Sequence, residues 1–404
     1  MGNLKFLAPV FFFLLAATIG GIFIFKSWQT TLYYSGEEIN NEQENSSDFS
    51  VEKEKVFVEK GQGVKGIYIN GFLANSQNQE AIATREEILS LLKETELNAV
   101  VIDIKESYGI YLPASLKEYI KELHENNVWV IARICAFRDS SLRETYPDWY
   151  LKYKNDNEEE VIWQDSGNGH WLDPKSRAVQ DYVINFSKRA IDFDFDELQF
   201  DYVRFPSDGD VENIIYPFYD SSQEEKYQAI REFFSRASQS LKNYDPEIIL
   251  SVDIFGYIAV HNNSTQIGQR TKDAAEYFDY ISYMLYPSHF YDGLQVSRDE
   301  KRELPFMYLT NNSEDLSKVV SNNVYAVVAR SIFAADDYIF SLGLKSKIRP
   351  WLQDFDINRD AERGIYYDNL KVKDQILASE ESGADGWLLW NPSGIYNKEA
   401  LIGN

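Results

Sequence analysis

The chain has 404 residues, of which 44 % are hydrophobic, and 40 Lys and Arg stand against 64 Asp and Glu for a formal net charge of −24. The apolar content excludes wholesale disorder, and the acidic balance excludes a nucleic-acid-binding protein, which needs a basic surface. The single cysteine, Cys135, excludes an intrachain disulfide and a Cys-rich zinc site.

The first segment is apolar. Residues 6–25 contain no charged side chain, and a helix of that length spans about 30 Å, the thickness of the hydrocarbon core of a bilayer. A cleaved secretory signal is the alternative, but its apolar region is usually only about 7–15 residues long. We therefore expect residues 1–26 to be a single-pass cell-membrane anchor, with the rest of the chain on the extracytoplasmic side.

The next segment, residues 27–60, is acidic and has little to bury. It carries eight acidic residues against three lysines. This composition is typical of a solvated, disordered linker. Residues 61–404 then form the expected globular domain.

From residue 61 onward, short β-rich runs alternate with longer amphipathic runs. Strands are expected at residues 64–70, 99–105, 128–135, 197–204, 248–254, 280–286, 348–353 and 386–391. Helices are expected at residues 84–95, 116–125, 174–191, 223–241, 314–342 and 369–382. Eight such units predict an α/β fold of the (β/α)8 TIM-barrel type. A doubly wound sheet is the alternative, although no GxGxxG follows the first strand.

Two helix starts have local signals. Thr84 and Glu87 have the spacing of a capping box. Asp173 before Pro174 predicts an N-cap followed by a proline at the first helical position. The longest insertions, residues 138–172 and 287–312, follow strands and should lie at the C-terminal face of the barrel, where barrel enzymes carry their sites.

Polar residues share the inward phase of several strands. Because side chains alternate between lumen and helix layer, the inward set is Asp103, Lys105, Arg133, Cys135, Gln199, Asp201, Val203, Ser251 and Asp253, with Tyr202 pointing outward. Buried carboxylates are costly unless they are paired or functional. Asp103, Asp201 and Asp253 therefore predict a carboxylate-lined pocket.

Two carboxylates on either side of a glycosidic bond are what glycoside hydrolysis requires. Asp201 and Asp253 come from neighbouring strands and can approach the short separation of a retaining pair. The structural alternative is that Asp103, Asp201 and Asp253 form salt bridges with Lys105, Arg133 or Arg204.

Further residues near the strand ends are candidates for substrate binding. They are Tyr68, Asp103, Arg133, Arg204, Tyr286, His289, Gln353, Asp354 and Trp390. Gln353 has the inward phase, whereas Asp354 falls out of phase unless a strand end or bulge turns it inward. Aromatic rings stack on sugar faces, and Trp351, Trp387 and the loop residues Trp149, Trp163 and Trp171 add to them, although packing is the default role of each ring.

No cofactor and no metal are expected. The four histidines, His124, His170, His261 and His289, have no metal-ligand spacing, and neither HExxH nor GxSxG occurs. Cys135 is read as a packing residue.

A series of motifs carries a resemblance to a known family. They are VKGIYINGF, LNAVVIDIKESYG, VWVIARICAFRD, WLDPKSRAVQDYV, FDELQFDYVRFPSDG, SVDIFG, DYISYMLYPSHF, IRPWLQDF and DGWLLWN, within residues 62–398. The chain resembles a bacterial family of glycoside-hydrolase-like (β/α)8 barrels long catalogued as a domain of unknown function. It is distantly similar to the superfamily of α-amylases and α-galactosidases.

The resemblance implies roles for two residues. In related barrels the nucleophile is an aspartate of the fourth strand, which corresponds to Asp201. The acid/base comes from strand five or six, where Asp253 is the available match, although amylase-like enzymes have a glutamate there. They also have an arginine two residues before the nucleophile, and here that position is Gln199.

The combined expectation is a membrane-anchored, extracytoplasmic glycoside hydrolase. Its substrate would be a cell-envelope or extracellular polysaccharide, its oligomeric state is not indicated, and nucleic acid is not a partner. A non-catalytic glycan-binding or envelope scaffold protein on the same barrel is the alternative, and a lyase or isomerase would need a phosphate or metal site. The acidity predicts either attraction of a cationic amino-sugar polymer or, as the preferred reading, surface solubility.

Overall fold

The computed structural model describes residues 60–264 and 266–402. The anchor expected at residues 1–26 and all of the linker except Lys60 lie outside the described residues. Across the described ranges, no helix has both the length and the apolar character that crossing a membrane requires. Membrane anchoring therefore stays a prediction.

Eight parallel strand positions close into a barrel. They are β1 (Val64–Ile69), β2 (Ala99–Glu106), β4 (Trp129–Cys135), β7 (Glu197–Asp201), β8 (Ile249–Phe255), β11 (Tyr280–Met284), the pair β14 (Lys347–Ile348) and β15 (Trp351–Gln353), and β16 (Gly386–Trp390). The order runs β1-β16-β15-β11-β8-β7-β4-β2, and β1 also pairs with β2. This last pairing closes the sheet, so the predicted (β/α)8 barrel is confirmed and the doubly wound alternative is wrong.

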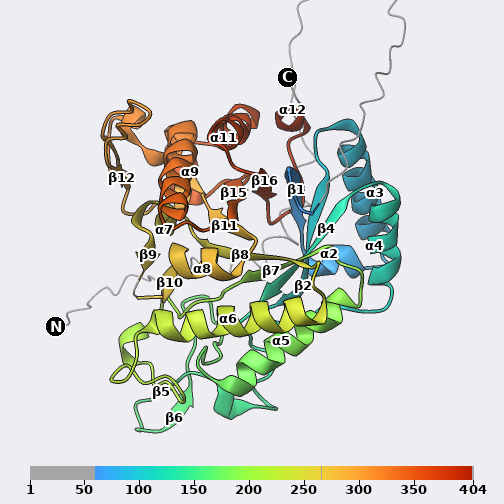
Figure 1. Ribbon diagram of the computed structural model, residues 1–404, viewed down its shortest axis with the longest axis vertical. Coiled ribbons are helices and arrows are strands. Elements are labelled where there is room, and N and C mark those ends of the chain that lie inside the picture. The colour runs from blue at the N-terminus through green and yellow to red at the C-terminus, as the bar shows by residue number, and fades with distance from the viewer. Residues whose placement is uncertain (1–59, 265, 403–404) are drawn as a thin grey trace, which may run out of the picture. The chain divides into compact units, whose positions relative to one another are not determined.

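Helices follow the strands and cover the outside of the barrel (Figure 1). The long ones are α3 (Gln79–Glu94), α4 (Leu116–Glu125), α5 (Arg177–Ile191), α6 (Lys226–Tyr244), α9 (Val324–Ser341) and α11 (Asn369–Glu381). Short helices are α2 (Gly71–Asn75), α7 (Gly256–His261), α8 (Thr271–Tyr277), α10 (Asn358–Ala361) and α12 (Lys398–Leu401). The fifth strand is thus followed by two short helices, where the sequence predicted none.

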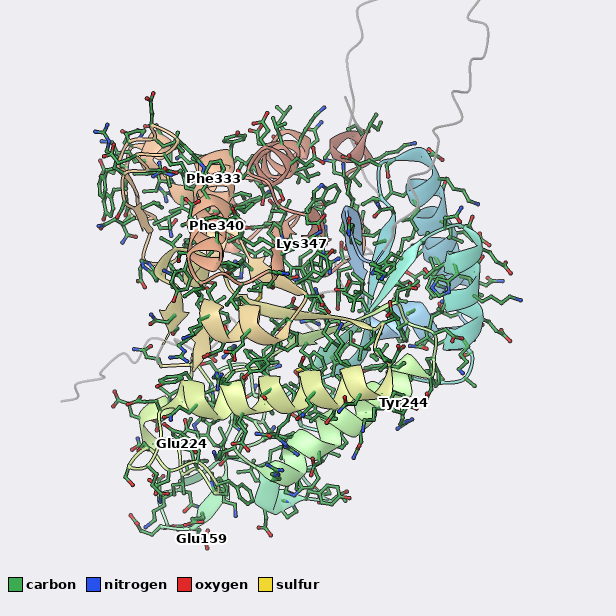
Figure 2. All side chains as sticks on the ribbon, in the orientation of Figure 1. Glu159, Glu224, Tyr244, Phe333, Phe340 and Lys347 are labelled. Atoms are coloured by element: carbon green, nitrogen blue, oxygen red, sulfur yellow. The ribbon has the colours of Figure 1, made fainter. Side chains whose placement is uncertain are left out.

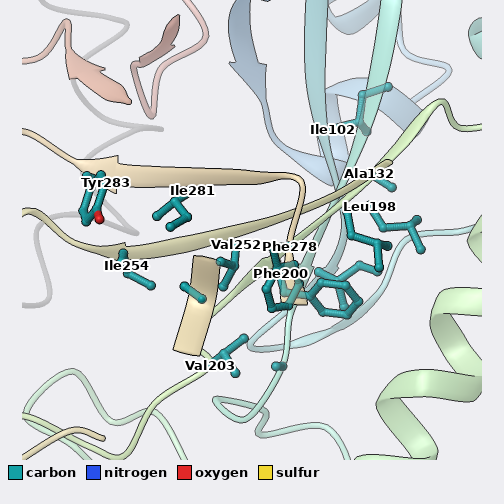
Figure 3. Packing of buried hydrophobic residues seen from close by; sticks show 14 of the residues in the cluster. Ile102, Ala132, Leu198, Phe200, Val203, Val252, Ile254, Phe278, Ile281 and Tyr283 are labelled. Atoms are coloured by element: carbon teal, nitrogen blue, oxygen red, sulfur yellow. The ribbon is translucent and has the colours of Figure 1, made fainter. Parts of the chain in front are cut away.

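The main core lies between the strands and these helices. Figure 3 shows outward side chains of successive strands packed together, including Ile102, Ala132, Leu198, Phe200 and Val252. Each is fully buried, which is what strict alternation along a strand that is covered on both faces produces. Trp387 also belongs to this outer core, so its expected place near the site is wrong.

A second, smaller cluster fills the lumen. Its members are Val64, Tyr68, Ala99, Val101, Ile131, Tyr286, Trp351 and Leu388. Below it, Arg349 forms an ion pair with Glu197 that is fully enclosed, and the Ser251 hydroxyl donates to the same carboxylate at 2.5 Å. The floor of the barrel is therefore closed by a buried polar cluster in which the Arg349 Nε alone has no hydrogen-bond partner within the described residues.

The fourth strand is shorter than predicted. β7 ends at Asp201, because Tyr202 has a left-handed backbone with φ of 52°. The alternation predicted to continue to residue 204 therefore stops there, and Val203 packs into the outer core instead of the lumen.

The second strand also departs from simple alternation. A bulge lies between Asp103 and Lys105, and the buried Lys105 ammonium pairs with Asp139 at 2.8 Å. Lys105 therefore does not neutralise the three aspartates.

Both predicted helix starts are wrong. Helix α3 begins at Gln79, and Asn78 caps it by accepting from the Ala81 amide at 2.7 Å. Helix α5 begins at Arg177 with Ser176 as its N-cap. In each case another capping side chain lies a few residues away and fixes the start.

Short antiparallel strand pairs lie in the loops of the barrel. They are β3 (Gly109–Ile110) on β2, β5 (Lys152–Lys154) with β6 (Glu160–Ile162), β9 (Asn263–Ser264) with β10 (Gln269–Arg270), and β12 (Leu294–Val296) with β13 (Met307–Leu309).

Figure 2 shows Glu159 and Glu224 at the end of the barrel unit opposite Tyr244, the last residue of α6. Since each helix returns from the strand that precedes it, the end with Glu224 is the C-terminal face.

Candidate active site

One arginine lies among the three predicted aspartates. Arg133 on β4 contacts Asp103 at 2.5 Å through Nη1, contacts Asp201 through Nη2, and approaches Asp253 at 3.5 Å through Nε. The aspartates come from β2, β7 and β8. The structure therefore brings together the three aspartates of the predicted pocket and Arg133, all of which the sequence placed in the inward phase.

This arrangement contains the salt bridges of the structural alternative, but they all use Arg133. Lys105 and Arg204 form no ion pair with these aspartates among the described residues. One guanidinium cannot neutralise three buried carboxylates. The cluster is therefore more than a balanced ion pair, and it has to take up protons.

Two of these carboxyl groups have raised pKa values. Burial, with the nearby Asp201 carboxylate, raises the pKa of Asp253 well above its ordinary value. Burial also raises the pKa of Asp103, against the opposing effect of Arg133. The shift favours the protonated form of Asp253, and a raised pKa beside a second carboxyl group is typical of pairs that divide acid and base roles.

The hydrogen bonds of the pair also differ. Asp253 accepts from the Trp351 indole at 2.8 Å, and the side chain of Asp253 is 1 % exposed. Asp201 accepts from the Tyr202 amide at 2.5 Å. The left-handed backbone of Tyr202 turns this N–H back to the preceding side chain, a strained conformation typical of functional sites.

Aromatic rings line the lumen around the cluster. Tyr68 donates to Asp103 at 2.6 Å, and Trp390 stacks on Tyr68 with centroids 3.9 Å apart. The Arg133 guanidinium lies 4.8 Å from the Trp390 ring centroid, and Trp351 meets Trp390 edge to face. These rings give the site an apolar wall of the kind that sugar faces stack on.

His289 and Gln353 lie in a neighbouring network. Ser288 links them, since its hydroxyl bonds His289 Nδ1 at 3.0 Å and donates to Gln353 at 3.0 Å. Burial lowers the pKa of His289 to about 4, so the imidazole is neutral at neutral pH. His289 packs edge to face on Tyr286, whose ring belongs to the lumen cluster.

Two predicted residues lie apart from the aspartate cluster. Arg204 is held by Phe205 and Ser207 in the loop after β7. Asp354 accepts from the Asn397 amide in the C-terminal segment, and burial raises its pKa to about 7. Asp354 is thus placed as its out-of-phase position suggested.

Sequence reasoning missed Glu106, the last residue of β2. Its carboxylate accepts from the Gly71 amide at 3.1 Å, and burial together with Asp103 raises its pKa. The position of Glu106 directly at the end of a strand was the sequence signal that could have identified it as a candidate site residue. No group of three or more His, Cys, Asp or Glu side chains suited to a metal ion occurs within residues 60–264 and 266–402.

The closed barrel and its site are those of a carbohydrate-active enzyme class: carboxyl groups that share one guanidinium lie beside aromatic rings. The chain belongs to the family described as "Putative glycosyl hydrolase domain", which matches residues 66–396. The resemblance drawn from the motifs is therefore confirmed, and the protein is a glycosidase by family.

Solved structures are similar to this chain over different spans. A hypothetical protein from Ruminiclostridium thermocellum is 30 % identical, covering 46 % of this chain and 96 % of that one, with a TM-score of 0.38. The glycoside hydrolase domain of PgaB (BpsB) from Bordetella bronchiseptica is 12 % identical, covering 84 % and 99 %, with a TM-score of 0.56. The latter shares the fold. No similar sequence is found among curated proteins.

Proposed function

We propose that the protein hydrolyses a glycosidic bond of a cell-envelope or extracellular polysaccharide by a two-carboxylate mechanism. Asp201 acts as the nucleophile and Asp253 as the acid/base. The observation that carries the proposal is the sharing of one guanidinium by three buried carboxyl groups, of which Asp253 has a strongly raised pKa.

The contacts of the pair fit these roles. The Arg133 guanidinium and the Tyr202 amide both contact the Asp201 carboxylate, as suits a group that reacts as an anion. The raised pKa of Asp253 favours its protonated form, which suits a group that delivers a proton to the leaving oxygen and later takes one from water. Its 1 % exposure means that the leaving oxygen has to reach the lumen beside Trp351.

The remaining predicted residues would hold the sugar. Tyr68 and Trp390 present a stacked pair of rings next to Asp103 and Arg133. Tyr286 and His289 extend the aromatic wall, and Gln353 fixes Ser288 behind them. Arg204 and Asp354 lie outside this group.

The location of the reaction is also a proposal. Residues 1–26 have the length and composition of a membrane anchor, and residues 27–60 those of a spacer. A barrel at residues 61–404 would then act outside the cytoplasm. The glycoside hydrolase domain of PgaB has a similar fold. This similarity supports the proposed substrate class through the fold alone.

The test is release of reducing ends from a panel of bacterial envelope and extracellular polysaccharides by the full-length chain. We expect turnover of at least one polymer and a loss of about 10³-fold or more in kcat for Asp201→Asn, with unchanged folding and glycan binding. If no polymer is cleaved while Asp201→Asn leaves binding and cellular function intact, the protein is the non-catalytic scaffold.

The acid/base role of Asp253 has its own test, with Glu106→Gln as the control at a second carboxyl group of raised pKa near Asp103. A general acid matters most for poor leaving groups, so Asp253→Asn should lower kcat/KM about 10²- to 10⁴-fold on an oligosaccharide. On an aryl glycoside with an acidic phenol the loss should be about tenfold or less. If Glu106→Gln shows this leaving-group dependence and Asp253→Asn does not, the assignment is wrong.

A further inference from the structure

Arg204 is a buried cation that the proposed mechanism does not use. The residue is 7 % exposed, and its guanidinium lies among three rings, with Cζ 4.8 Å from the Trp171 centroid, 5.3 Å from Tyr202 and 4.6 Å from Phe255. No Asp or Glu oxygen of a described residue lies within 4.0 Å of its nitrogens, whereas Arg133, Arg138 and Arg349 each have at least one. Arg204 is therefore a buried charge without a direct ion-pair partner among the described residues. Burial lowers its pKa, and Asp201 and Asp208 oppose this effect from beyond that distance.

One edge of this guanidinium is free. Nη1 donates to the Phe205 carbonyl at 3.0 Å and to the Ser207 hydroxyl at 3.2 Å, while Nε and Nη2 donate to no group of the described residues. Neither nitrogen is among the enclosed polar atoms that lack a partner, so both reach solvent. Nε and Nη2 form the fork that binds a carboxylate or phosphate through two parallel hydrogen bonds.

The position of this fork relates it to the site. Arg204 follows Asp201 by three residues, and its neighbour Phe255 follows Asp253 by two. Gln269 ties the two strand ends together, because its side-chain amide donates to the carbonyls of Val203 and Asp253. Arg204 thus lies across the ends of the two strands that carry the proposed catalytic pair.

Another buried arginine shows what a structural role looks like in this chain. Arg330 on α9 also lacks a carboxylate partner among the described residues. Its two terminal nitrogens instead donate hydrogen bonds to the carbonyls of Pro305 and Ser297. Arg330 therefore ties the β12–β13 insertion to α9. Arg204 instead leaves its fork open towards solvent.

We propose that Arg204 determines substrate specificity by binding an anionic group, a carboxylate or a phosphate, on a sugar next to the scissile bond. This inference rests on the proposed function and names its substrate class. The three rings shield the rest of the guanidinium from water, and this lowers the local dielectric and strengthens its pairing with an anion that binds the open edge. It is the opposite of the cationic polymer that the net charge of −24 could attract.

The experiment measures binding by the full-length chain carrying Asp201→Asn, so that no ligand is cleaved. The probes are a linear hexuronic-acid oligosaccharide with its carboxyl-reduced counterpart, and a phosphorylated oligosaccharide with its dephosphorylated counterpart. We expect the charged member of one pair to bind about 10- to 100-fold tighter. The pair that shows this preference identifies the anion.

The variants decide whether Arg204 is responsible. Arg204→Gln should bring the ratio of affinities close to one, and Arg204→Lys should keep part of it, because an ammonium lacks the fork. Arg330→Gln, the matched buried control, should leave the ratio unchanged. Equal binding of the charged and neutral members, or a preference that survives in Arg204→Gln, overturns the inference.

The experiment also covers a variant that does not fold, and it separates failure of this inference from failure of the proposed function. If Arg204→Gln does not fold, Arg204→Lys and the paired ligands on the Asp201→Asn background give the answer. Because binding is measured without turnover, an Arg204-dependent preference together with a wild-type chain that cleaves none of the polymers would defeat the proposed function alone. Cleavage of neutral glycans without such a preference would defeat this inference alone.

Discussion

At the scale of single residues, Arg133 governs the electrostatics of the lumen. Its guanidinium contacts carboxyl groups from three strands, and the same carboxyl groups raise its pKa well above the ordinary value against the effect of burial. Removing one partner of a buried charge cluster leaves the others without compensation, which is strongly destabilising. The site is thus part of what stabilises the barrel.

Arg133→Met should therefore destabilise the fold by about 3–5 kcal/mol at pH 7.5. The cost should fall at pH 5.5, because carboxyl groups without their cation take up protons more readily and lose their charge. Urea unfolding at both pH values measures this. Arg298→Met, at an exposed ion pair, should change stability by less than about 1 kcal/mol. A cost for Arg133→Met as small as that of the control would contradict the role given to Arg133.

Asp354 offers a pH-dependent test, because burial raises its pKa from 3.8 to about 7 in the folded chain. Between these values the folded state holds a proton that the unfolded state has lost. The wild type therefore loses stability as pH rises from about 4 through 7, while Asp354→Asn stays neutral throughout. The stability of the variant relative to the wild type should rise by about 2–3 kcal/mol between pH 5 and 8, as measured by urea unfolding.

The two proteins should differ least below pH 3.8, where Asp354 is mostly protonated in folded and unfolded chains alike. A constant difference from pH 4 to 8 would show that Asp354 is ionised in the fold. The free second oxygen of this carboxylate, which has no partner within the described residues, agrees with a protonated group.

The residues of the site were largely predictable from strand alternation. It placed Asp103, Arg133, Asp201 and Asp253 in the lumen, as the structure has them. The choice of partner was not predictable, because a period-two pattern gives the face of a side chain and no distance across the barrel. By alternation alone, Arg204 and Lys105 were equal candidates for pairing with the aspartates. The left-handed backbone of Tyr202 and the bulge in β2 place their side chains elsewhere.

At the scale of elements, closure of the barrel depends on a close approach between its first and last strands. Gly386 opens β16 with φ of +88°, and a Cβ there would lie 2.0 Å from the Val64 carbonyl oxygen of β1. The register pairs Val64 with Gly386. Only glycine allows both the backbone conformation and the contact.

Gly386→Ala should accordingly destabilise the barrel by more than about 3 kcal/mol, since a steric clash with backbone adds to the strain of a left-handed residue. Gly343→Ala is the matched control: its φ is also positive, at +67°, but nothing lies within 4 Å of the added carbon. It should cost only about 1–2 kcal/mol. Denaturant unfolding measures both, and equal costs would show that strain alone matters at residue 386.

The elements were predictable where the pattern was long and were missed where it was short. Six strands lie within two residues of their predicted bounds, because their apolar runs are covered by helices. The seventh is interrupted at Pro350, which has no N–H for the ladder, and splits into β14 and β15. The two- and three-residue pairs, such as β9 with β10, depend on tertiary contacts and leave no periodic signal.

At the scale of the whole molecule, the net charge of −24 describes the surface better than it describes the site. The lumen holds an aspartate of strongly raised pKa and a shared guanidinium, and Arg204 adds a cation in the loop after β7. Global charge therefore predicts solubility and does not identify the substrate.

The anchor is tested by fractionation of cells that express the full-length chain or residues 60–404 alone. We expect the full-length chain to sediment with membranes and to resist extraction with alkaline carbonate, because residues 6–25 supply an uncharged span of about 30 Å. The shorter chain should stay in the supernatant and keep the cooperative unfolding of the barrel. A full-length chain that loses its first segment to cleavage, and is then released, would favour the secretory signal.

The assignment of Asp201 as nucleophile is tested most directly by covalent labelling. The full-length chain would be treated with an epoxide analogue of a sugar that it cleaves, digested, and sequenced by mass spectrometry. We expect one label, on the Asp201 carboxylate within the segment that ends at Arg204, and none in the Asp201→Asn variant. A label on another carboxylate, or hydrolysis that continues with no label at all, would contradict the account.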